Sequence, residues 1–356
     1  MEDRKELADR ELVQMELNRC VGILEKNMKR FGTDFPSACA TNGKYRIKKN
    51  DDWTNGFWTG MLWIAWLYTG KDLFRSLALE NVKSFQKRLE DHFVLDHHDI
   101  GFLYSLSVVA AWKVTREEDL KSVIVRAADV LASRYQKKGG FIQAWGKTGD
   151  EKEYRLIIDS LLNLPLLYTA YEITGNKGYQ DIAESHYDKV IRNIVREDYS
   201  TYHTFYFDPA TGQPDHGATH QGFSDSSCWA RGQAWAILGM PLHARLSKKG
   251  FTVEEKELYD HVCAYFEDHL PSDKMPYWDL IFTDGSDQPR DSSALAIAAC
   301  GMLEMNRSQR AGEMVAVLNA LASSKGEADP EGMILHGVYA YGEGKGVDEP
   351  NLWGDY

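Results

Sequence analysis

The chain has 356 residues, 43% of them hydrophobic, and this length permits a large buried core. Its formal net charge of −12 excludes nucleic acid as an expected partner, because the overall field repels phosphate. No apolar run is long enough to cross a bilayer, and the charged first six residues have no signal-peptide character. Five scattered cysteines without a C-x-x-C motif favour a reducing compartment over a disulfide framework, so we expect a cytoplasmic protein without membrane contact.

A weak repeat follows an N-terminal amphipathic helix expected over residues 4–30. Each unit has an apolar helix, a turn and a charged helix with one apolar face, as over 117–135 and 179–195. The turns contain helix-stopping glycines such as Gly70 and Gly175. The apolar helices are hydrophobic on nearly all sides, as buried helices are, and begin at intervals of 42 to 70 residues, near Phe57, Asp99, Asp159, Trp229, Asp291 and Trp353.

This pairing of a buried helix with an outer helix predicts a closed ring of helical hairpins. Six units make an all-α fold, an (α/α)6 barrel, with residues 1–356 as a single catalytic domain. The inner helix that begins at Trp353 is expected to be cut short at the C-terminus. The loops before the inner helices would form one open end of the ring, the mouth, with Asp99, Asp159 and Asp291 facing it. Long loops that we expect to hold short strands rise on the same side, over 137–156, 199–228 and 272–290.

Asp99 and Asp159 are the candidate catalytic residues. Each stands at the head of an apolar run, and poor solvation raises the pKa of a carboxylic acid towards the range useful for proton transfer. Two such carboxylates at matching positions of successive units predict general acid/base chemistry in one shared pocket. The alternative interpretation is that each aspartate only caps its helix.

The segment 200–233 is dense in polar and aromatic side chains. Arg231 lies just inside a predicted inner helix, where a buried cation needs an anion. That anion is a substrate carboxylate or one of the two aspartates; alternatively, Arg231 belongs to a structural Arg–Asp pair. Several tryptophans near helix starts, including Trp53 and Trp145, suit stacking on sugar faces, although a role as core residues is an equal alternative.

A metal centre is not expected. His92, Asp96, His97, His98 and Asp99 offer ligand types, but adjacent ligands point to different sides and no H-E-x-x-H motif is present. At least one of the two adjacent histidines is expected instead to orient Asp99 or to pack at the mouth. We therefore predict neither a metal nor an organic cofactor.

Six strings together resemble glycoside hydrolase family 88, the unsaturated glucuronyl hydrolases. They are residues 50–60 (NDDWTNGFWTG), 97–102 (HHDIGF), 158–163 (IDSLLN), 229–235 (WARGQAW), 291–294 (DSSA) and 345–348 with 353–356 (KGVD, WGDY). The resemblance implies an (α/α)6 barrel that hydrates the C4=C5 double bond of a 4,5-unsaturated uronic acid. This unsaturated uronic acid is the sugar at the non-reducing end of a lyase-generated oligosaccharide of glycosaminoglycan or gellan type.

The resemblance also implies roles for individual residues. Asp159 matches the residue that protonates C4 and then accepts a proton from the attacking water. Asp99 matches a second essential carboxylate, which holds sugar hydroxyls and keeps the pKa of Asp159 raised. The stretch 336–345 lacks the serines that bind sulfate in some members, and Glu343 would repel sulfate, so unsulfated substrates are preferred. The substrate-binding residues are His98, His203, Gln221, Arg231, Trp53, Trp145, Trp229 and Trp235.

Three other functions remain as alternatives. An unsaturated rhamnogalacturonyl hydrolase would perform the same chemistry on pectin fragments. A sugar epimerase or isomerase would use histidine pairs as acid and base, and a carbohydrate-binding protein would bind sugar without catalysis. A monomer or a homodimer is expected.

Overall fold

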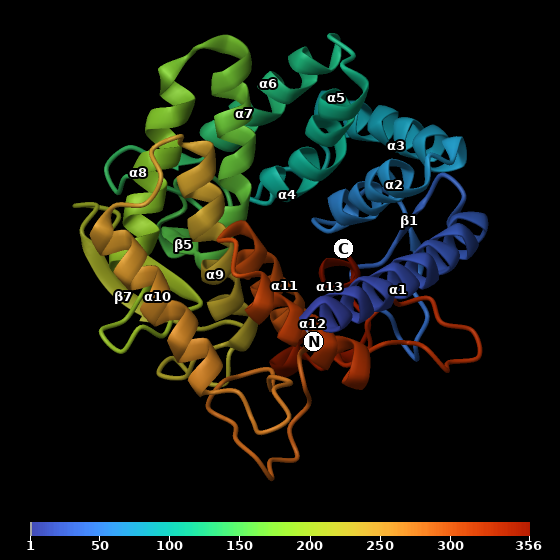
Figure 1. The fold of residues 1–356 in the computed structure, drawn as a ribbon. Helices are drawn as coiled ribbons and strands as arrows, with labels where there is room; N and C mark the ends of the chain where they lie inside the picture. Colours follow the sequence, from blue (N-terminus) through green and yellow to red (C-terminus); the bar gives the residue numbers. More distant parts are fainter. Residues whose placement is uncertain (1) are drawn as a thin grey trace.

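The computed structural model describes residues 2–356, with side chains described from residue 10 onward. Its helices form two layers of a ring, as Figure 1 shows along the ring axis. The inner helices are α2 (Asn55–Thr69), α4 (Ile100–Tyr104), α7 (Leu164–Thr174), α9 (Ala230–Leu246), α11 (Ser292–Glu304) and α13 (Leu352–Asp355). The outer helices are α1 (Glu2–Phe31), α3 (Asp72–Glu90), α6 (Leu120–Ala132), α8 (Lys177–Ile194), α10 (Val253–Asp268) and α12 (Ser308–Leu321).

This order of helices confirms the predicted ring of hairpins. Consecutive helices pack as pairs, and the one-turn helix α13 contacts both α2 and α11, so the ring closes between the last and first units. Gly70 and Gly175 end α2 and α7 in left-handed conformations with φ of 69° each, as the glycine stops predicted. The outer helix expected over 117–135 is shorter, because its predicted end belongs to a separate strand, β3 (Tyr135–Gln136).

Two inner elements depart from a regular α-helix, and the second of them holds Asp159. After α4 the chain runs through a π-helical turn, η1 (Ser105–Val109), into α5 (Ala110–Thr115). Before α7 lies a 3₁₀ turn, η3 (Ile158–Asn163), and Pro165 in the first turn of α7 favours the start of the α-helix there. The 3₁₀ turn η3 holds Asp159 and contacts α4, which Asp99 directly precedes, so the two aspartates lie close together.

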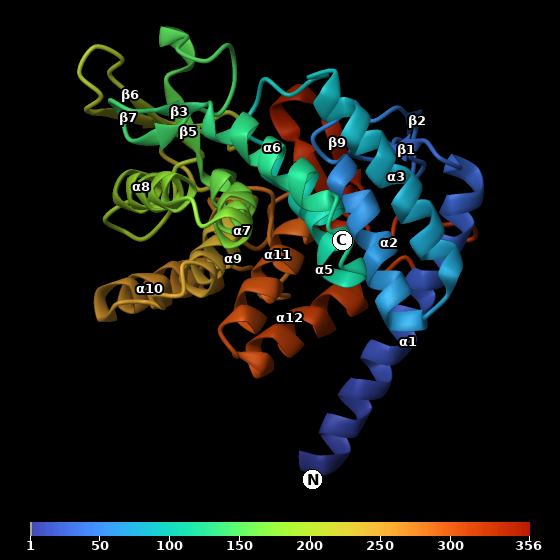
Figure 2. The same cartoon turned by 90° about the horizontal axis from the view of Figure 1, so that it is seen from above.

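Short strands gather at one end of the ring, as seen in Figure 2. The loops 137–156 and 199–228 contribute β4 (Phe141–Ile142), β5 (Arg155–Ile157), β6 (Thr204–Phe207) and β7 (Pro214–Ala218). The last three pair in antiparallel order β5-β6-β7, with Leu156 opposite Phe205. The remaining strands are β1 (Phe35–Pro36) with β2 (Ile47–Lys48), and β8 (Gly337–Ala340) with β9 (Lys345–Glu349).

The strands expected over 272–290 are wrong. Among the described residues this loop has only isolated bridges, such as Tyr277 with Arg290. Its polar groups are satisfied by side chains instead: Asp284 accepts from the backbone N–H of Ser272, and Arg290 pairs with Asp273. A loop held in this way does not need a strand ladder.

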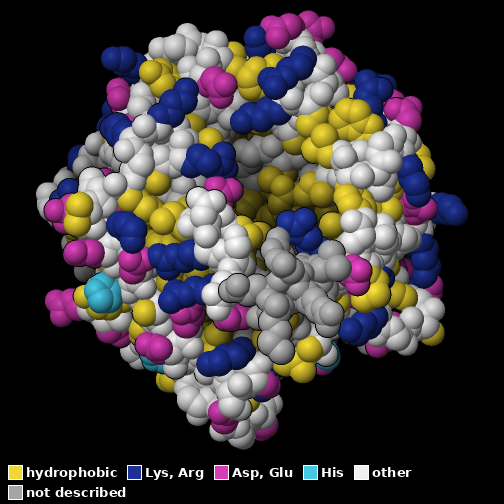
Figure 3. All heavy atoms as spheres, in the orientation of Figure 1, with side chains coloured by type: hydrophobic (Ala, Val, Ile, Leu, Met, Phe, Trp, Pro, Cys, Tyr) yellow, Lys and Arg dark blue, Asp and Glu magenta, His cyan; other side chains and the backbone are white. Residues whose placement is uncertain are grey.

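The end of the ring opposite the strands is hollow, and Figure 3 shows this hollow as a central depression lined with hydrophobic side chains. Inner-helix residues, among them Phe102, Leu106 and Trp235, surround this cavity of about 480 Å³. No helix in residues 2–356 is long and apolar enough to cross a membrane.

Candidate active site

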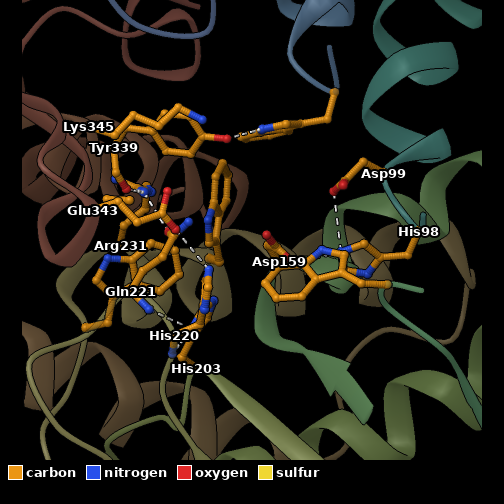
Figure 4. A pocket seen from close by; sticks show the side chains of 15 residues that line it. His98, Asp99, Asp159, His203, His220, Gln221, Arg231, Tyr339, Glu343 and Lys345 are labelled. Carbon is orange, nitrogen blue, oxygen red and sulfur yellow. Dashed lines mark hydrogen bonds and ion pairs between the residues drawn. The ribbon is translucent and has the colours of Figure 1, made fainter. Parts of the chain in front are cut away.

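A cavity of about 260 Å³ opens among the loops at the mouth. Asp99 and His98 lie on one side of it, and Arg231, Gln221 and Glu343 on the opposite side (Figure 4). All ten predicted site residues line this cavity, and five others join them. The lining consists of Trp53, His98, Asp99, Trp145, Asp159, His203, His220, Gln221, Trp229, Arg231, Trp235, Tyr339, Ala340, Glu343 and Lys345.

Asp99 directly precedes α4, yet its carboxylate forms no capping hydrogen bond. One carboxylate oxygen lies 3.2 Å from Nδ1 of His97, and the other lies 3.4 Å from Nε2 of His98. Both adjacent histidines therefore contact Asp99, as one of the two was expected to do. The capping interpretation is wrong for this residue.

Asp159 lies inside the 3₁₀ turn η3 and does not cap it, since the residue before that turn is Ile157. Its side chain is 17% exposed, and Oδ1 lies 3.5 Å from Nε2 of His98. Oδ1 is buried without a hydrogen-bond partner among the described side chains. The capping interpretation is wrong here too, and an unpaired buried oxygen is expensive if the carboxyl group is ionised.

The two carboxyl groups have opposite pKa shifts. Burial, followed by the negative charge of Asp99, raises the pKa of Asp159 well above its usual range. Burial also acts to raise the pKa of Asp99, but the neighbouring His98 and His97 together outweigh it and lower this pKa. Poor solvation therefore decides the state of Asp159 only; the prediction that it raises both pKa values is wrong for Asp99. One protonated and one ionised carboxyl group is the arrangement of an acid beside an electrostatic stabiliser.

His98 lies between these carboxyl groups and is only 1% exposed. Burial lowers the pKa of His98 to about 4, although the charge of Asp99 opposes the shift, so the imidazole is neutral at physiological pH. Ligand atoms of His98, Asp99 and Asp159 all lie within 4.8 Å of one another. Such a trio resembles part of a metal site, but a carboxylic acid that retains its proton is a poor ligand. The absence of a metal stays a prediction.

Arg231 is 2% exposed and forms a structural ion pair. Nη1 lies 2.9 Å from the carboxylate of Asp291, which also caps α11, and it donates to the carbonyl of Val338. Nη2 donates to Oε1 of Gln221 and to the carbonyl of Tyr339. The prediction that Asp291 faces the mouth is wrong, because it is fully buried behind Arg231. The counter-anion is this third aspartate, neither Asp99 nor Asp159.

The polar wall opposite Asp99 holds His203 as a neutral ring. Its Nδ1 accepts the backbone N–H groups of His220 at 2.8 Å and Gln221 at 3.2 Å, which leaves the proton on Nε2. Burial, and then the nearby His220 and Arg231, lower the pKa of His203 well below its usual range. This ring is therefore a hydrogen-bond donor of fixed tautomer at neutral pH.

The aromatic lining is tied together by ring contacts. Trp53 stacks on Trp353 with ring centroids 5.4 Å apart, and its indole N–H donates to the Tyr339 hydroxyl at 2.8 Å. The Arg231 guanidinium lies 4.5 Å from the ring of Trp229 and 4.8 Å from that of Trp353. Rigid indoles around a small cavity suit the apolar faces of a pyranose.

Sequence reasoning did not assign His220, Tyr339, Ala340 and Lys345 to the pocket lining, and it considered Glu343 only for its effect on a substrate sulfate. The hairpin of β8 and β9 supplies all of these except His220, and Nε2 of His220 lies 3.3 Å from Oε1 of Glu343 on the same side of the mouth. The polar density of segment 200–233 was a signal for His220. No local pattern marks Tyr339, because its place depends on a strand more than one hundred residues from Arg231.

The comparisons with known proteins agree with this site. Residues 27–354 match the model of Glycosyl Hydrolase Family 88. An unsaturated chondroitin disaccharide hydrolase from Streptococcus pneumoniae is 47% identical over 98% of this chain and 91% of its own length. The crystal structure of an unsaturated glucuronyl hydrolase from Bacillus sp. GL1, responsible for glycosaminoglycan degradation, has 41% identity and a TM-score of 0.92, over 96% and 94% of the two chains.

A third relative was solved with a ligand. It is an unsaturated glucuronyl hydrolase variant from Streptococcus agalactiae complexed with dGlcA-GalNAc6S, with 40% identity and a TM-score of 0.84 over 97% and 88% of the two chains. These structural neighbours confirm the (α/α)6 barrel. Because the family model spans most of the sequence and relatives above 40% identity align over nearly all of it, this chain is a member of glycosyl hydrolase family 88.

Proposed function

We propose that this protein is an unsaturated glucuronyl hydrolase that acts on lyase-generated glycosaminoglycan oligosaccharides. The observation that supports this most directly is a carboxylic acid with a raised pKa, Asp159, beside the ionised Asp99 in an aromatic cavity. The names of relatives that align over nearly the whole chain support the substrate class.

In the proposed reaction Asp159 donates its proton to C4 of the unsaturated uronate. Electron density leaves the C4=C5 double bond, and positive charge develops at C5 and the ring oxygen. The negative charge of Asp99 stabilises this cation, because a carboxylate in a water-poor site acts strongly on nearby charge. Water then adds at C5 and gives its proton to the newly ionised Asp159, so the acid is regenerated. The C5 hemiketal opens and releases the remaining sugar.

The other lining groups position the substrate in this proposal. Neutral His98 and His203 offer hydrogen bonds to sugar hydroxyls without adding cations that would oppose the developing charge at C5. The Nη1 and Nη2 groups of Arg231 already have protein partners, so this residue acts on the substrate mainly through its positive charge and by orienting Gln221. Trp53, Trp145, Trp229 and Trp235 enclose the ring of the uronate.

We also expect one catalytic domain over residues 1–356, a cytoplasmic location, and a monomer or homodimer. Size-exclusion chromatography with light scattering checks the oligomeric state. Limited proteolysis checks the single domain, which would give no stable subfragment.

Loss of the ultraviolet absorbance of the C4=C5 double bond tests the function. Wild type, Asp159→Asn and Asp99→Asn are each mixed with unsaturated chondroitin, hyaluronan, heparin, gellan and rhamnogalacturonan oligosaccharides. We expect absorbance loss with wild type on the glycosaminoglycan oligosaccharides, no loss with either aspartate variant, and normal activity of Asp215→Asn, an exposed control that does not line the cavity. Turnover of the rhamnogalacturonan fragment alone would replace the proposed substrate class, and full activity of Asp159→Asn would refute the mechanism.

A further inference from the structure

A cluster of partly exposed aromatic side chains lies beside the mouth and takes no part in the proposed chemistry. Trp278 forms its centre and is 2% exposed. Tyr341 stacks on this indole with ring centroids 4.4 Å apart, and the rings of Phe223 and Phe282 lie 6.4 Å and 5.7 Å from it. We call these four residues the aromatic patch.

The patch leaves apolar surface in water. Phe223 is 57% exposed, Tyr341 is 36% exposed, and the neighbouring Ile281 is 51% exposed. Single exposed apolar residues need no explanation, but contiguous apolar surface on a folded protein marks an interaction site.

The patch is continuous with one wall of the active-site cavity. Phe223 follows the lining residue Gln221 by two positions, and Tyr341 lies between the lining residues Ala340 and Glu343. The backbone N–H of Ala230, next to the lining residue Trp229, donates to the carbonyl of Trp278 at 3.1 Å. Two segments of this wall therefore continue along the chain into the patch, and the third is hydrogen-bonded to it.

The patch is held in place before any ligand arrives. Asp279 is fully buried and accepts from the backbone N–H of Phe223 at 2.9 Å and from the hydroxyl of Ser227 at 2.7 Å. The indole N–H of Trp278 donates to Gln288 at 3.1 Å. Preformed aromatic surfaces bind with a small entropy cost, because few rotamers remain to be ordered.

The chemistry of the patch selects its ligand. An oligosaccharide whose unsaturated end lies against Asp99 and Asp159 must leave through the mouth, where His220 and Glu343 form one side. The rings that the patch exposes, chiefly those of Phe223 and Tyr341, carry no formal charge, so they suit the C–H face of a pyranose and offer no cation to a sulfate group.

We propose that the aromatic patch is an outer sugar subsite that stacks on the third and later residues of an unsaturated oligosaccharide. This inference rests on the proposed function and extends it: the protein binds unsaturated tetrasaccharides more tightly than the disaccharide of the same polysaccharide. Glu343 and His220 then lie beside the second sugar, between the catalytic cavity and the patch.

The test compares unsulfated unsaturated disaccharide and tetrasaccharide as substrates of wild type and Phe223→Ala, by loss of double-bond absorbance. The control is Phe93→Ala, which removes a phenyl ring that is 50% exposed and outside the patch. We expect Phe223→Ala to raise KM for the tetrasaccharide by roughly 2- to 12-fold, the range of a single aromatic contact. The variant should leave kcat and KM for the disaccharide unchanged. The Phe93 variant should match wild type on both substrates.

Equal effects of Phe223→Ala on the two substrates, or none on the tetrasaccharide, would overturn the subsite. A self-associating wild type that becomes monomeric in Phe223→Ala would also overturn it, since the patch would then be an interface between copies of this chain. Disaccharide turnover by wild type reports separately on the proposed function, so failure of the subsite leaves that function intact.

Discussion

Asn163 joins the 3₁₀ turn that holds Asp159 to helix α4, which Asp99 directly precedes, and its removal is our most informative prediction. It is the last residue of η3, which contains Asp159, and its Oδ1 accepts the backbone N–H of Phe102 in α4 at 2.8 Å. Gly101 lies against it so closely that a Cβ there would come within 2.2 Å of the Asn163 Cα. The separation of Asp99 from Asp159 therefore depends on this contact.

Asn163→Ala leaves the N–H of Phe102 buried without an acceptor. Asn163 is 1% exposed, so water does not replace the lost partner, and we expect a loss of about 1–3 kcal/mol in the free energy of unfolding. We also expect turn η3 and helix α4 to separate slightly. Because the charge of Asp99 helps to raise the pKa of Asp159, this pKa falls and the alkaline limb of the kcat/KM profile moves to lower pH.

Urea denaturation gives the first quantity, and kcat/KM against pH on an unsaturated chondroitin disaccharide gives the second. The matched control is Asn81→Ala, which removes another asparagine that is 1% exposed and donates at 3.1 Å to Thr59, away from the cavity. It should lose comparable stability without moving the pH profile. An unchanged profile in Asn163→Ala, or an equal shift in the control, would refute the reasoning.

Four further predictions follow from the same geometry. Because the pKa of Asp159 is raised in the folded state, its ionisation destabilises the fold as pH rises above the unfolded value of 3.8. Asp159→Asn should therefore have a higher Tm than wild type at pH 7 and the same Tm below pH 3.8. Calorimetry at both pH values measures this, and a less stable variant at pH 7 would contradict it. Wild-type kcat/KM should fall as pH rises through that raised pKa, since only protonated Asp159 donates to C4, and a rate independent of pH would argue against an acid of this kind. Asp291→Asn removes the anion of a buried ion pair while Arg231 stays charged, so it should lower the free energy of unfolding, measured in urea, by about 3–5 kcal/mol. A loss below about 1 kcal/mol would show that the backbone carbonyls alone stabilise the Arg231 guanidinium. With Glu343 in the lining, initial rates should be lower on a hexosamine-sulfated chondroitin disaccharide than on the unsulfated one, and the reverse order would overturn this preference.

The order of helices could be predicted from the sequence because each helix is specified by its own residues. Side chains from residue 61 to 67 are all apolar, which predicts a largely buried helix, and Gly70 ends it in a left-handed conformation. Met61, Leu62 and Trp63 are buried as expected, whereas Ile64 and Leu67 are exposed. Seven of the ten site residues could be predicted for a different reason: they lie within strings that resemble a known family. Trp145, His203 and Gln221 lie outside those strings and were predicted from the resemblance of the chain as a whole. Neither source of information requires knowledge of contacts between distant segments.

The tertiary structure decided the features that depend on contacts between distant residues. Asp291 pairs with Arg231 across 60 positions, and Tyr339 reaches the same guanidinium through its carbonyl across 108. The 3₁₀ turn at Asp159 lies against the chain around Gly101, whereas the local pattern predicted an α-helix start. Local sequence determines which segments are helical and apolar, because helix propensity and side-chain periodicity are short-range properties. The tertiary structure decides which buried charges pair with each other, because pairing requires that the closed ring bring distant segments into one low-dielectric cavity. The same contacts decide which of the two aspartates keeps its proton.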